Sequence, residues 1–241
     1  MRHARPPIAA TVAALALALL GLTGHARSGR ALERDGLAEV LVRRAGHVVA
    51  RGSAVVVAAR EEDGELACYL LTAGHLVSLG GPAPAAALEV VLAVDGAGAR
   101  AVPTQLLHHV DGDDADLAVL RAVGARCRPV RIGLAGTPAE DVWLAGFAVR
   151  GAVDVWPGHV RHAGTLRWTV ESPVSEGASG GGVFDARTGG LVGLIQGYWT
   201  ARLVTVGGPV PGEARTGTAA VVPIDRVQAL LRAWGLDDLL E

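Results

Sequence analysis

Short apolar runs, broken every few residues by glycine, proline or aspartate, recur through most of this chain of 241 residues. Half of the residues are hydrophobic, 33 are glycine and only 4% are aromatic, a composition that favours short strands joined by tight turns. The pattern predicts an all-β barrel or sandwich. Among its elements we expect strands over 54–59, 141–147, 165–170, 182–185 and 191–196, and a loop or loose hairpin over 201–216.

One helix is expected near the end of the chain, over residues 224–234. Pro223 precedes it and Asp225 favours the positive end of its dipole. Four apolar residues are spaced to form one face, which predicts packing against the second half of the fold: Val227, Leu230, Leu231 and Trp234.

The N-terminus resembles a secretory signal peptide. Arg2 and Arg5 precede an apolar stretch over 8–22, and small residues follow at 24–26. This stretch is shorter than the ~20 residues of a membrane span. We therefore expect a signal peptide over 1–26 and a linker over 27–37, with a periplasmic or secreted protein as the result. An uncleaved, membrane-anchored form is the alternative.

Three segments carry nucleophilic or titratable side chains of the kinds used in catalysis. Ser179 lies among four glycines in the run from Glu176 to Phe184, His75 ends an apolar strand-like run, and Asp116 opens another. A serine hydroxyl needs a base to take its proton, and histidine titrates in the suitable range. A carboxylate fixes the imidazole tautomer and stabilises the imidazolium. The chain thus holds a nucleophile, a base and an orienting acid in the order His, Asp, Ser. Asp113 and Asp114 compete with Asp116 for the last role.

These motifs resemble those of the trypsin-like serine proteases of the chymotrypsin fold. Thr72-Ala73-Gly74-His75, Asp116-Leu117-Ala118-Val119-Leu120 and Gly177-Ala178-Ser179-Gly180-Gly181 are similar to the histidine, aspartate and serine motifs of the family. The nearest resemblance is to bacterial HtrA/Deg-type protease domains, here without a PDZ domain. It rests also on Gly52-Ser53 followed by apolar residues, on Gly190-Leu191-Val192-Gly193 and on Val222-Pro223-Ile224-Asp225.

The resemblance implies two six-stranded antiparallel β-barrels and a short C-terminal helix. It assigns 38–241 to a trypsin-like protease domain, with the first barrel over about 38–128, the second over about 129–223 and the helix over 224–234. The implied function is an exported serine endopeptidase that acts through an acyl-enzyme. A latent or non-catalytic peptide-binding protein on the same fold is the alternative.

The resemblance also implies roles for individual residues. His75, Asp116 and Ser179 would be catalytic, and the backbone N–H groups of Gly177 and Ser179 would form the oxyanion hole. Substrate would lie along the strand of Gln196, Gly197 and Tyr198, beside a primary pocket near Pro173 and Ile195. No acid stands at the base of that pocket, so with Ser172 nearby we expect a small or medium apolar side chain at the cleavage site rather than arginine or lysine.

Two departures from the family pattern stand beside Ser179. Ala178 occupies the place where animal trypsins have an aspartate, so activation by an N-terminal salt bridge is not expected. Gly182 replaces the proline or small apolar residue of many relatives, which removes no catalytic group.

Protein or peptide substrates are the expected partners, and the sequence leaves the oligomeric state open. The net charge of −2 gives no reason to expect nucleic acid. His108 and His109 with Asp111, Asp113 and Asp114 resemble a metal cluster, but successive strand residues point to opposite faces, so neither a metal nor another cofactor is expected. Cys68 and Cys127 are the two cysteines, and the resemblance puts them on or near neighbouring strands. A disulfide and two buried free thiols are equally compatible with this placement.

Overall fold

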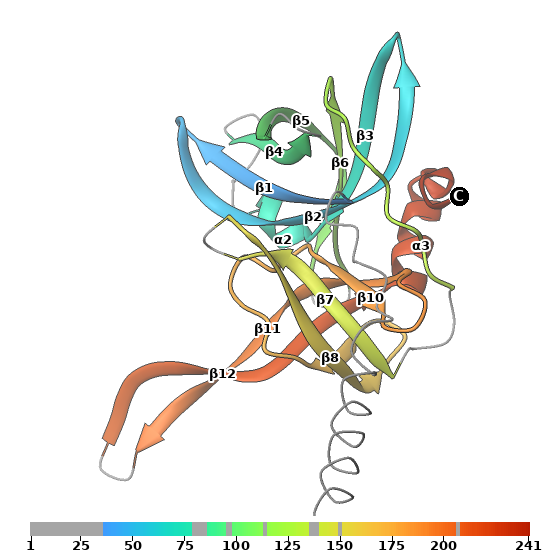
Figure 1. Cartoon of the computed structure of the whole chain (residues 1–241). Helices are drawn as coiled ribbons and strands as arrows, with labels where there is room; N and C mark the ends of the chain where they lie inside the picture. Colours follow the sequence, from blue (N-terminus) through green and yellow to red (C-terminus); the bar gives the residue numbers. More distant parts are fainter. Residues whose placement is uncertain are drawn as a thin grey trace, which may run out of the picture. The chain divides into compact units, whose positions relative to one another are not determined.

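Two closed antiparallel β-barrels of six strands each make up the described part of the chain (Figure 1). The computed structural model describes residues 36–78, 86–94, 98–112, 115–134, 140–148, 151–205 and 208–241. The strand order around the first barrel is β1-β2-β3-β6-β5-β4, and around the second it is β10-β11-β12-β9-β8-β7. The predicted chymotrypsin-like architecture is therefore confirmed.

The first barrel uses the strands of the N-terminal half. They are β1 (Leu37–Arg44), β2 (His47–Glu62), β3 (Glu65–Thr72), β4 (Ala86–Val94), β5 (Gly98–Asp111) and β6 (Asp116–Val123). The second barrel uses the remaining strands, followed by the C-terminal helices. They are β7 (Asp141–Phe147), β8 (Val153–Ala163), β9 (Trp168–Glu171), β10 (Gly182–Asp185), β11 (Leu191–Thr205), β12 (Gly208–Pro223), α3 (Ile224–Ala233) and the 3₁₀ helix η2 (Asp237–Leu240).

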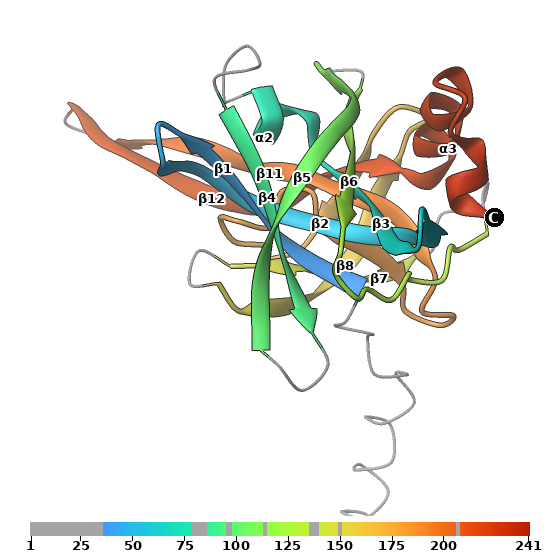
Figure 2. The same ribbon diagram turned by 90° about the horizontal axis from the view of Figure 1, so that it is seen from above.

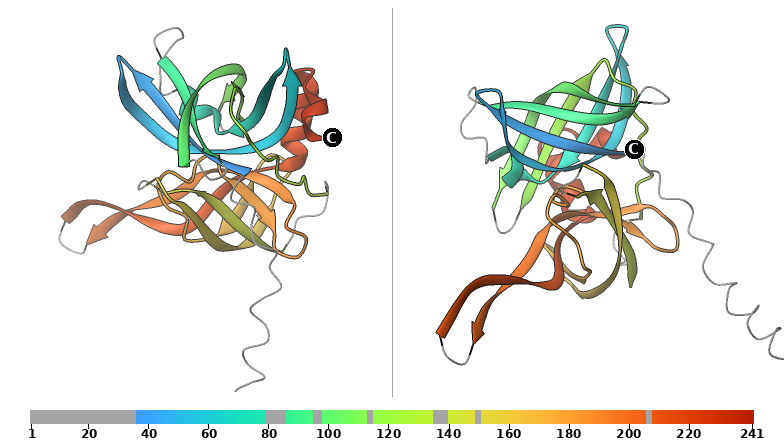
Figure 3. Two further views of the ribbon diagram at one scale, coloured as in Figure 1. Left: turned by 45° about the horizontal axis from the view of Figure 1, so that its top comes forward. Right: turned by 60° about the vertical axis from the view of Figure 1, so that its left-hand side comes forward.

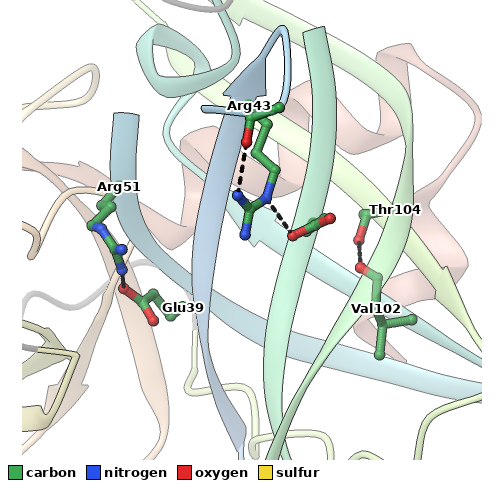
Figure 4. Close-up of polar contacts among 7 residues, drawn as sticks. Glu39, Arg43, Arg51, Val102 and Thr104 are labelled. Carbon is green, nitrogen blue, oxygen red and sulfur yellow. Dashed lines mark hydrogen bonds and ion pairs between the residues drawn. The ribbon is translucent and has the colours of Figure 1, made fainter. Parts of the chain in front are cut away.

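Alternation along the strands separates the core of the first barrel from its outer wall. Ala38, Val40 and Val42 of β1 point into the apolar core, since successive strand residues face opposite sides. Between them, Glu39 accepts a hydrogen bond from Arg51 of β2 at 2.7 Å, and Arg43 pairs with a carboxylate of β4 at 2.8 Å (Figure 4). These cross-strand pairs hold the register of the wall outside the core.

The second barrel differs from the first in one long extension. Beyond the barrel, β11 and β12 stay paired from Thr200 opposite Arg215 to Thr205 opposite Gly208, as a two-stranded ribbon that projects away from the barrels (Figures 1 and 3). The expected strand over 191–196 is therefore too short, and of the two alternatives expected over 201–216, a loop or a loose hairpin, the structure has a hairpin, whose pairing is interrupted by register shifts. β9 runs over Trp168–Glu171 instead of starting at residue 165.

The C-terminal helices bind to both halves of the fold (Figure 2). Val227 and Leu231 of α3 are fully buried, whereas Trp234 stacks on His108 of β5, with the ring centroids 5.4 Å apart. Arg60 of β2 donates to the Asp238 side chain in η2 at 2.7 Å. The helix was expected to pack on the second barrel. Together with η2, it also attaches the end of the chain to the first barrel.

The expected signal peptide over 1–26 and most of the linker over 27–37 lie outside the described residues. Within the described ranges, the helices are all too short or too polar to cross a bilayer.

Candidate active site

His75 lies on α2 (Gly74–Ser78), a single helical turn that directly follows β3. The strand before it was expected to end at Thr72, as β3 does, but no helical turn was expected after it. Gly74 makes the turn feasible, because a Cβ there would lie 1.9 Å from the Val110 carbonyl oxygen. The chain that follows β3 can therefore pass close to the end of β5 and the start of β6. Asp116 is the first residue of β6.

Asp116 binds His75 through both of its carboxylate oxygens. Oδ2 lies 2.8 Å from the ring Nδ1, and Oδ1 accepts the His75 backbone N–H at 2.8 Å. Only 2% of the Asp116 side chain is exposed, against 34% for His75. Because a carboxylate can only accept, Nδ1 carries the proton and Nε2 keeps its lone pair. The competing residues Asp113 and Asp114 lie outside the described ranges.

This pair changes the proton affinity of the imidazole. The hydrogen bond to Asp116 raises the pKa of His75 above its ordinary value of 6.5, more than partial burial lowers it. A nearby negative charge favours the protonated ring. The arrangement therefore makes His75 a stronger base than free histidine.

Ser179 lies in a tight turn just before β10. Ala178 N–H donates to the Ser175 carbonyl at 3.2 Å, and Gly177 has a φ of 91°, as in a type II turn. Glycine is favoured there because other residues rarely adopt a positive φ. Among the described residues, the N–H groups of Gly177 and Ser179 have no hydrogen-bond acceptor. Two donors beside a serine hydroxyl are what an oxyanion hole requires.

Glycines bring this serine loop against the chain that leads to His75. A Cβ on Gly180 would lie 2.1 Å from the Ser53 carbonyl oxygen and 2.3 Å from Thr72 Oγ1, so only glycine fits. A Cβ on Gly52 would meet both the Leu76 side chain and the Ser179 carbonyl oxygen. The fold thus brings the three motifs of the sequence to the contact between the barrels.

One contact of a working triad is missing. In the part of the chain that the structure describes, no hydrogen bond joins the Ser179 hydroxyl to the His75 ring. Catalytic hydrogen bonds are often long in unliganded enzymes and tighten when substrate binds. The structure thus shows His75 paired with Asp116, and the loop of Ser179 packed against the chain that leads to His75.

The residues expected to bind substrate lie in different surroundings. Pro173 is exposed, whereas the Ile195 side chain is buried in the core of the second barrel and only its backbone meets the serine loop. Ile195 accepts from Gly180 N–H at 2.7 Å and donates to Gly181 O at 2.8 Å. The Ile195 side chain therefore contributes to the core. Its backbone holds the chain beside Ser179.

The next positions on β11 are more open. A Cβ on Gly197 would meet nothing within 4 Å, and Tyr198 is half-buried. Gln196 Oε1 and Ser172 Oγ are buried and lack hydrogen-bond partners among the described residues.

Cys68 and Cys127 form a disulfide with an S–S distance of 2.09 Å. It links β3, the strand that leads to His75, to the segment between the barrels, and it resolves the choice between a bridge and two free thiols. His108 and His109 lie opposite Val119 and Ala118 on β6. No group of three potential metal ligands gathers within the described ranges.

Sequence reasoning missed the part played by Ser53. Its position was noted only as part of a Gly-Ser pattern, yet it is fully buried and its hydroxyl lies 2.7 Å from the Gly177 carbonyl oxygen. The two residues are 124 positions apart, so no local signal could have joined them.

Comparisons with known proteins agree with this geometry. Residues 52–194 match the model of the trypsin-like peptidase domain. The Rv3671c protease in its inactive form has a TM-score of 0.60 at 16% identity, covering 98% of this chain and 100% of that one. The serine endoprotease of Yersinia pestis has a TM-score of 0.58 at 19% identity, covering 86% of this chain but only 63% of that one. A serine-to-alanine form of Rv3671c from M. tuberculosis also matches, with a TM-score of 0.57 at 17% identity, covering 82% of this chain and 86% of that one. Among curated proteins, none matches the chain significantly.

Proposed function

We propose that this chain, which belongs to the trypsin-like peptidase domain family, is a serine endopeptidase that uses His75, Asp116 and Ser179. The observation that carries the proposal is the pair of hydrogen bonds that Asp116 accepts from His75, one from its ring Nδ1 and one from its backbone N–H, both at 2.8 Å. It leaves Nε2 unprotonated and raises the pKa of His75. A base of this kind is what a serine hydroxyl needs to become nucleophilic.

The proposed reaction has two stages. His75 Nε2 takes the proton of Ser179 as Oγ attacks the scissile carbonyl, and the N–H groups of Gly177 and Ser179 stabilise the oxyanion. Protonated His75 then gives its proton to the leaving amine, which releases the first product and leaves the acyl-enzyme. Water activated by His75 hydrolyses that ester and restores Ser179.

We propose Gln196, Gly197 and Tyr198 as the segment that pairs with the substrate backbone. The open space at Gly197 supports this assignment, since a peptide can approach the backbone there. At the position of the pocket base stands Pro173, which carries no charge to attract arginine or lysine, and the nearby Glu171 accepts a hydrogen bond from Arg161 at 2.6 Å. A small or medium apolar side chain is the proposed preference at the cleavage site.

Export to the periplasm or the medium is part of the proposal. The apolar stretch over 8–22 behind Arg2 and Arg5 supports it, and so does the disulfide, which persists in oxidising compartments. In this reading the protease domain over 38–241 follows a signal peptide over 1–26, with an anchored form as the alternative.

A latent or peptide-binding protein is the second candidate. The observation that favours it is the missing hydrogen bond between Ser179 and His75 in the described part of the chain. In that case the serine needs an activating partner or does not react.

Reaction with a fluorophosphonate probe distinguishes the two candidates. We expect the purified full chain to be labelled and the Ser179→Ala variant to remain unlabelled, because the probe reacts only with an activated serine. Profiling with a peptide library then tests the cleavage preference. A well-folded chain that is not labelled would contradict the protease proposal and favour the latent form.

A further inference from the structure

Ser53 is a buried residue of the first barrel. Its hydroxyl, its backbone N–H and its carbonyl all form hydrogen bonds with the loop of Ser179 or with residues next to that loop. Ser53 lies on β2 with no exposed surface. Its hydroxyl donates to the Gly177 carbonyl at 2.7 Å and accepts from Phe147 N–H at 2.7 Å. Phe147 is the last residue of β7, so one hydroxyl contacts two segments of the second barrel.

The direction of these bonds is fixed by chemistry. A backbone N–H can only donate, so Phe147 must use a lone pair of the Ser53 oxygen. The hydroxyl proton is then free to point only at the other partner, the Gly177 carbonyl. The bond to Gly177 therefore has one orientation, and no rotation of the hydroxyl can satisfy both partners in another way.

The backbone of Ser53 adds two further contacts. Its N–H donates to the Ser179 carbonyl at 2.7 Å, and its carbonyl accepts from Thr72 Oγ1 at 2.6 Å. Ser53 thus holds the carbonyls of Gly177 and Ser179, on either side of Ala178. Through Thr72 it also holds the end of β3, three residues before His75.

These contacts determine where the proposed oxyanion donors point. The carbonyl of Gly177 and the N–H of Ala178 belong to one peptide plane, and the N–H groups of Gly177 and Ser179 flank it. Fixing the carbonyls of Gly177 and Ser179 limits the rotation of the one peptide plane between them, which carries the Ser179 N–H, while the Gly177 N–H lies on the plane that precedes the fixed Gly177 carbonyl. From this geometry we infer that Ser53 is a positioning residue, which holds the Gly177–Ser179 turn so that its N–H groups face the reacting carbonyl.

This inference rests on the proposed function, but it makes a separate structural claim about the turn. Ser53→Ala removes the hydroxyl and leaves the Gly177 carbonyl and Phe147 N–H without their partner. Thr104→Val is the matched control, because the Thr104 hydroxyl donates to the Val102 carbonyl on β5, in the wall of the first barrel (Figure 4). Thr104 contacts no residue of the proposed site.

The activity test compares kcat and KM for a peptide ester in the three proteins. Losing one oxyanion donor lowers kcat about 10²- to 10³-fold. A donor that is present but misplaced should lower kcat less than a donor that is lost. We therefore expect Ser53→Ala to lower kcat roughly 10- to 100-fold. KM should stay within about threefold, since the interaction acts in the transition state. A peptide boronate should lose affinity in proportion to kcat, while the pH midpoint set by His75 stays unchanged. Thr104→Val should leave all of these values near those of the original chain.

Hydrogen exchange tests the structural claim even if the chain proves inactive. We expect faster exchange at Gly177 to Gly181 in Ser53→Ala and unchanged exchange there in Thr104→Val. If the original chain has no activity but the turn loosens, the protease proposal fails and the positioning role stands. An unchanged turn, or a fall in kcat no larger than in Thr104→Val at equal stability, would overturn the positioning role.

Discussion

The two barrels have the same strand count and hold their parts of the site in different ways. In the first barrel, a buried carboxylate binds His75 directly through two side-chain hydrogen bonds. In the second barrel, Ser179 lies in a loop held by backbone bonds, by glycines and by a hydroxyl that belongs to the first barrel. His75 is thus positioned within its own barrel, whereas the position of Ser179 depends on the contact between the two barrels.

The largest expected effect comes from changing the carboxylate. Asp116→Asn should lower kcat/KM about 10⁴-fold, because an amide cannot hold His75 in the tautomer that leaves Nε2 free. Steady-state hydrolysis of a peptide ester measures it, and circular dichroism checks that the fold remains. A loss of less than tenfold in a folded variant would contradict the role of Asp116.

Gly180→Ala tests the dependence of the nucleophile on the contact between barrels. Its Cβ would lie 2.1 Å from the Ser53 carbonyl oxygen, and Gly180 has a φ of 82°, so steric overlap adds to backbone strain. We expect the free energy of unfolding to fall by about 2–5 kcal/mol.

Gly217→Ala is the control for backbone strain alone. Its φ is 73°, but a Cβ there would meet nothing within 4 Å. We expect a loss of about 1 kcal/mol, measured for both variants by urea unfolding. Equal losses would show that the contact at Gly180 adds nothing.

The disulfide should stabilise the fold without acting on the chemistry. Cys68 and Cys127 are 59 residues apart, and closing a loop of that length contributes about 2–4 kcal/mol. The double variant Cys68→Ala/Cys127→Ala should therefore unfold at lower urea but keep its fluorophosphonate labelling under native conditions. Reductant should destabilise the original chain and leave the variant unaffected. Loss of labelling in the folded variant would show that the bridge positions His75.

The smallest expected effect is in the pH dependence near neutrality. Protonated His75 cannot accept the Ser179 proton, so kcat/KM should fall as the pH falls through the pKa of His75. Because Asp116 raises that pKa, the midpoint should lie above 6.5, the ordinary value. A pH profile of ester hydrolysis gives the midpoint, and residual activity of Asp116→Asn should show a lower one. A midpoint below 6.5 would contradict the pairing with Asp116.

The sequence was most predictive for short strands whose residues pack against a core. The residue patterns around Asp141–Phe147 and Gly182–Asp185 predicted those strands to the residue. By contrast, β2 and β11 extend well beyond their predicted ends. Both ends of β2 lie outside its buried run, so no apolar face marks them in the sequence, and the glycines and prolines over 201–216 favoured a loop or loose hairpin.

For the site, local motifs indicated the residue types but not their contacts. The motifs brought out His75, Asp116 and Ser179, while the helical turn at His75 was hidden in an apolar run. Ser53 could not have been found in this way, because its role exists only after Gly177 reaches it from 124 positions along the chain. Contacts of that span depend on tertiary structure and leave no local pattern.

The span of the Ser53 contact also has a consequence for the order of folding. During synthesis the N-terminal barrel emerges first, and domains generally fold as units in that order. At that stage the chain has its base and acid but neither the nucleophile nor the turn that Ser53 holds. The proposed protease would therefore become able to hydrolyse peptides only at the end of folding. The step before it is the pairing of strands distant in sequence, which is the slow step in β-rich folds. A growing chain of this design would be unable to digest itself or its neighbours before it is complete.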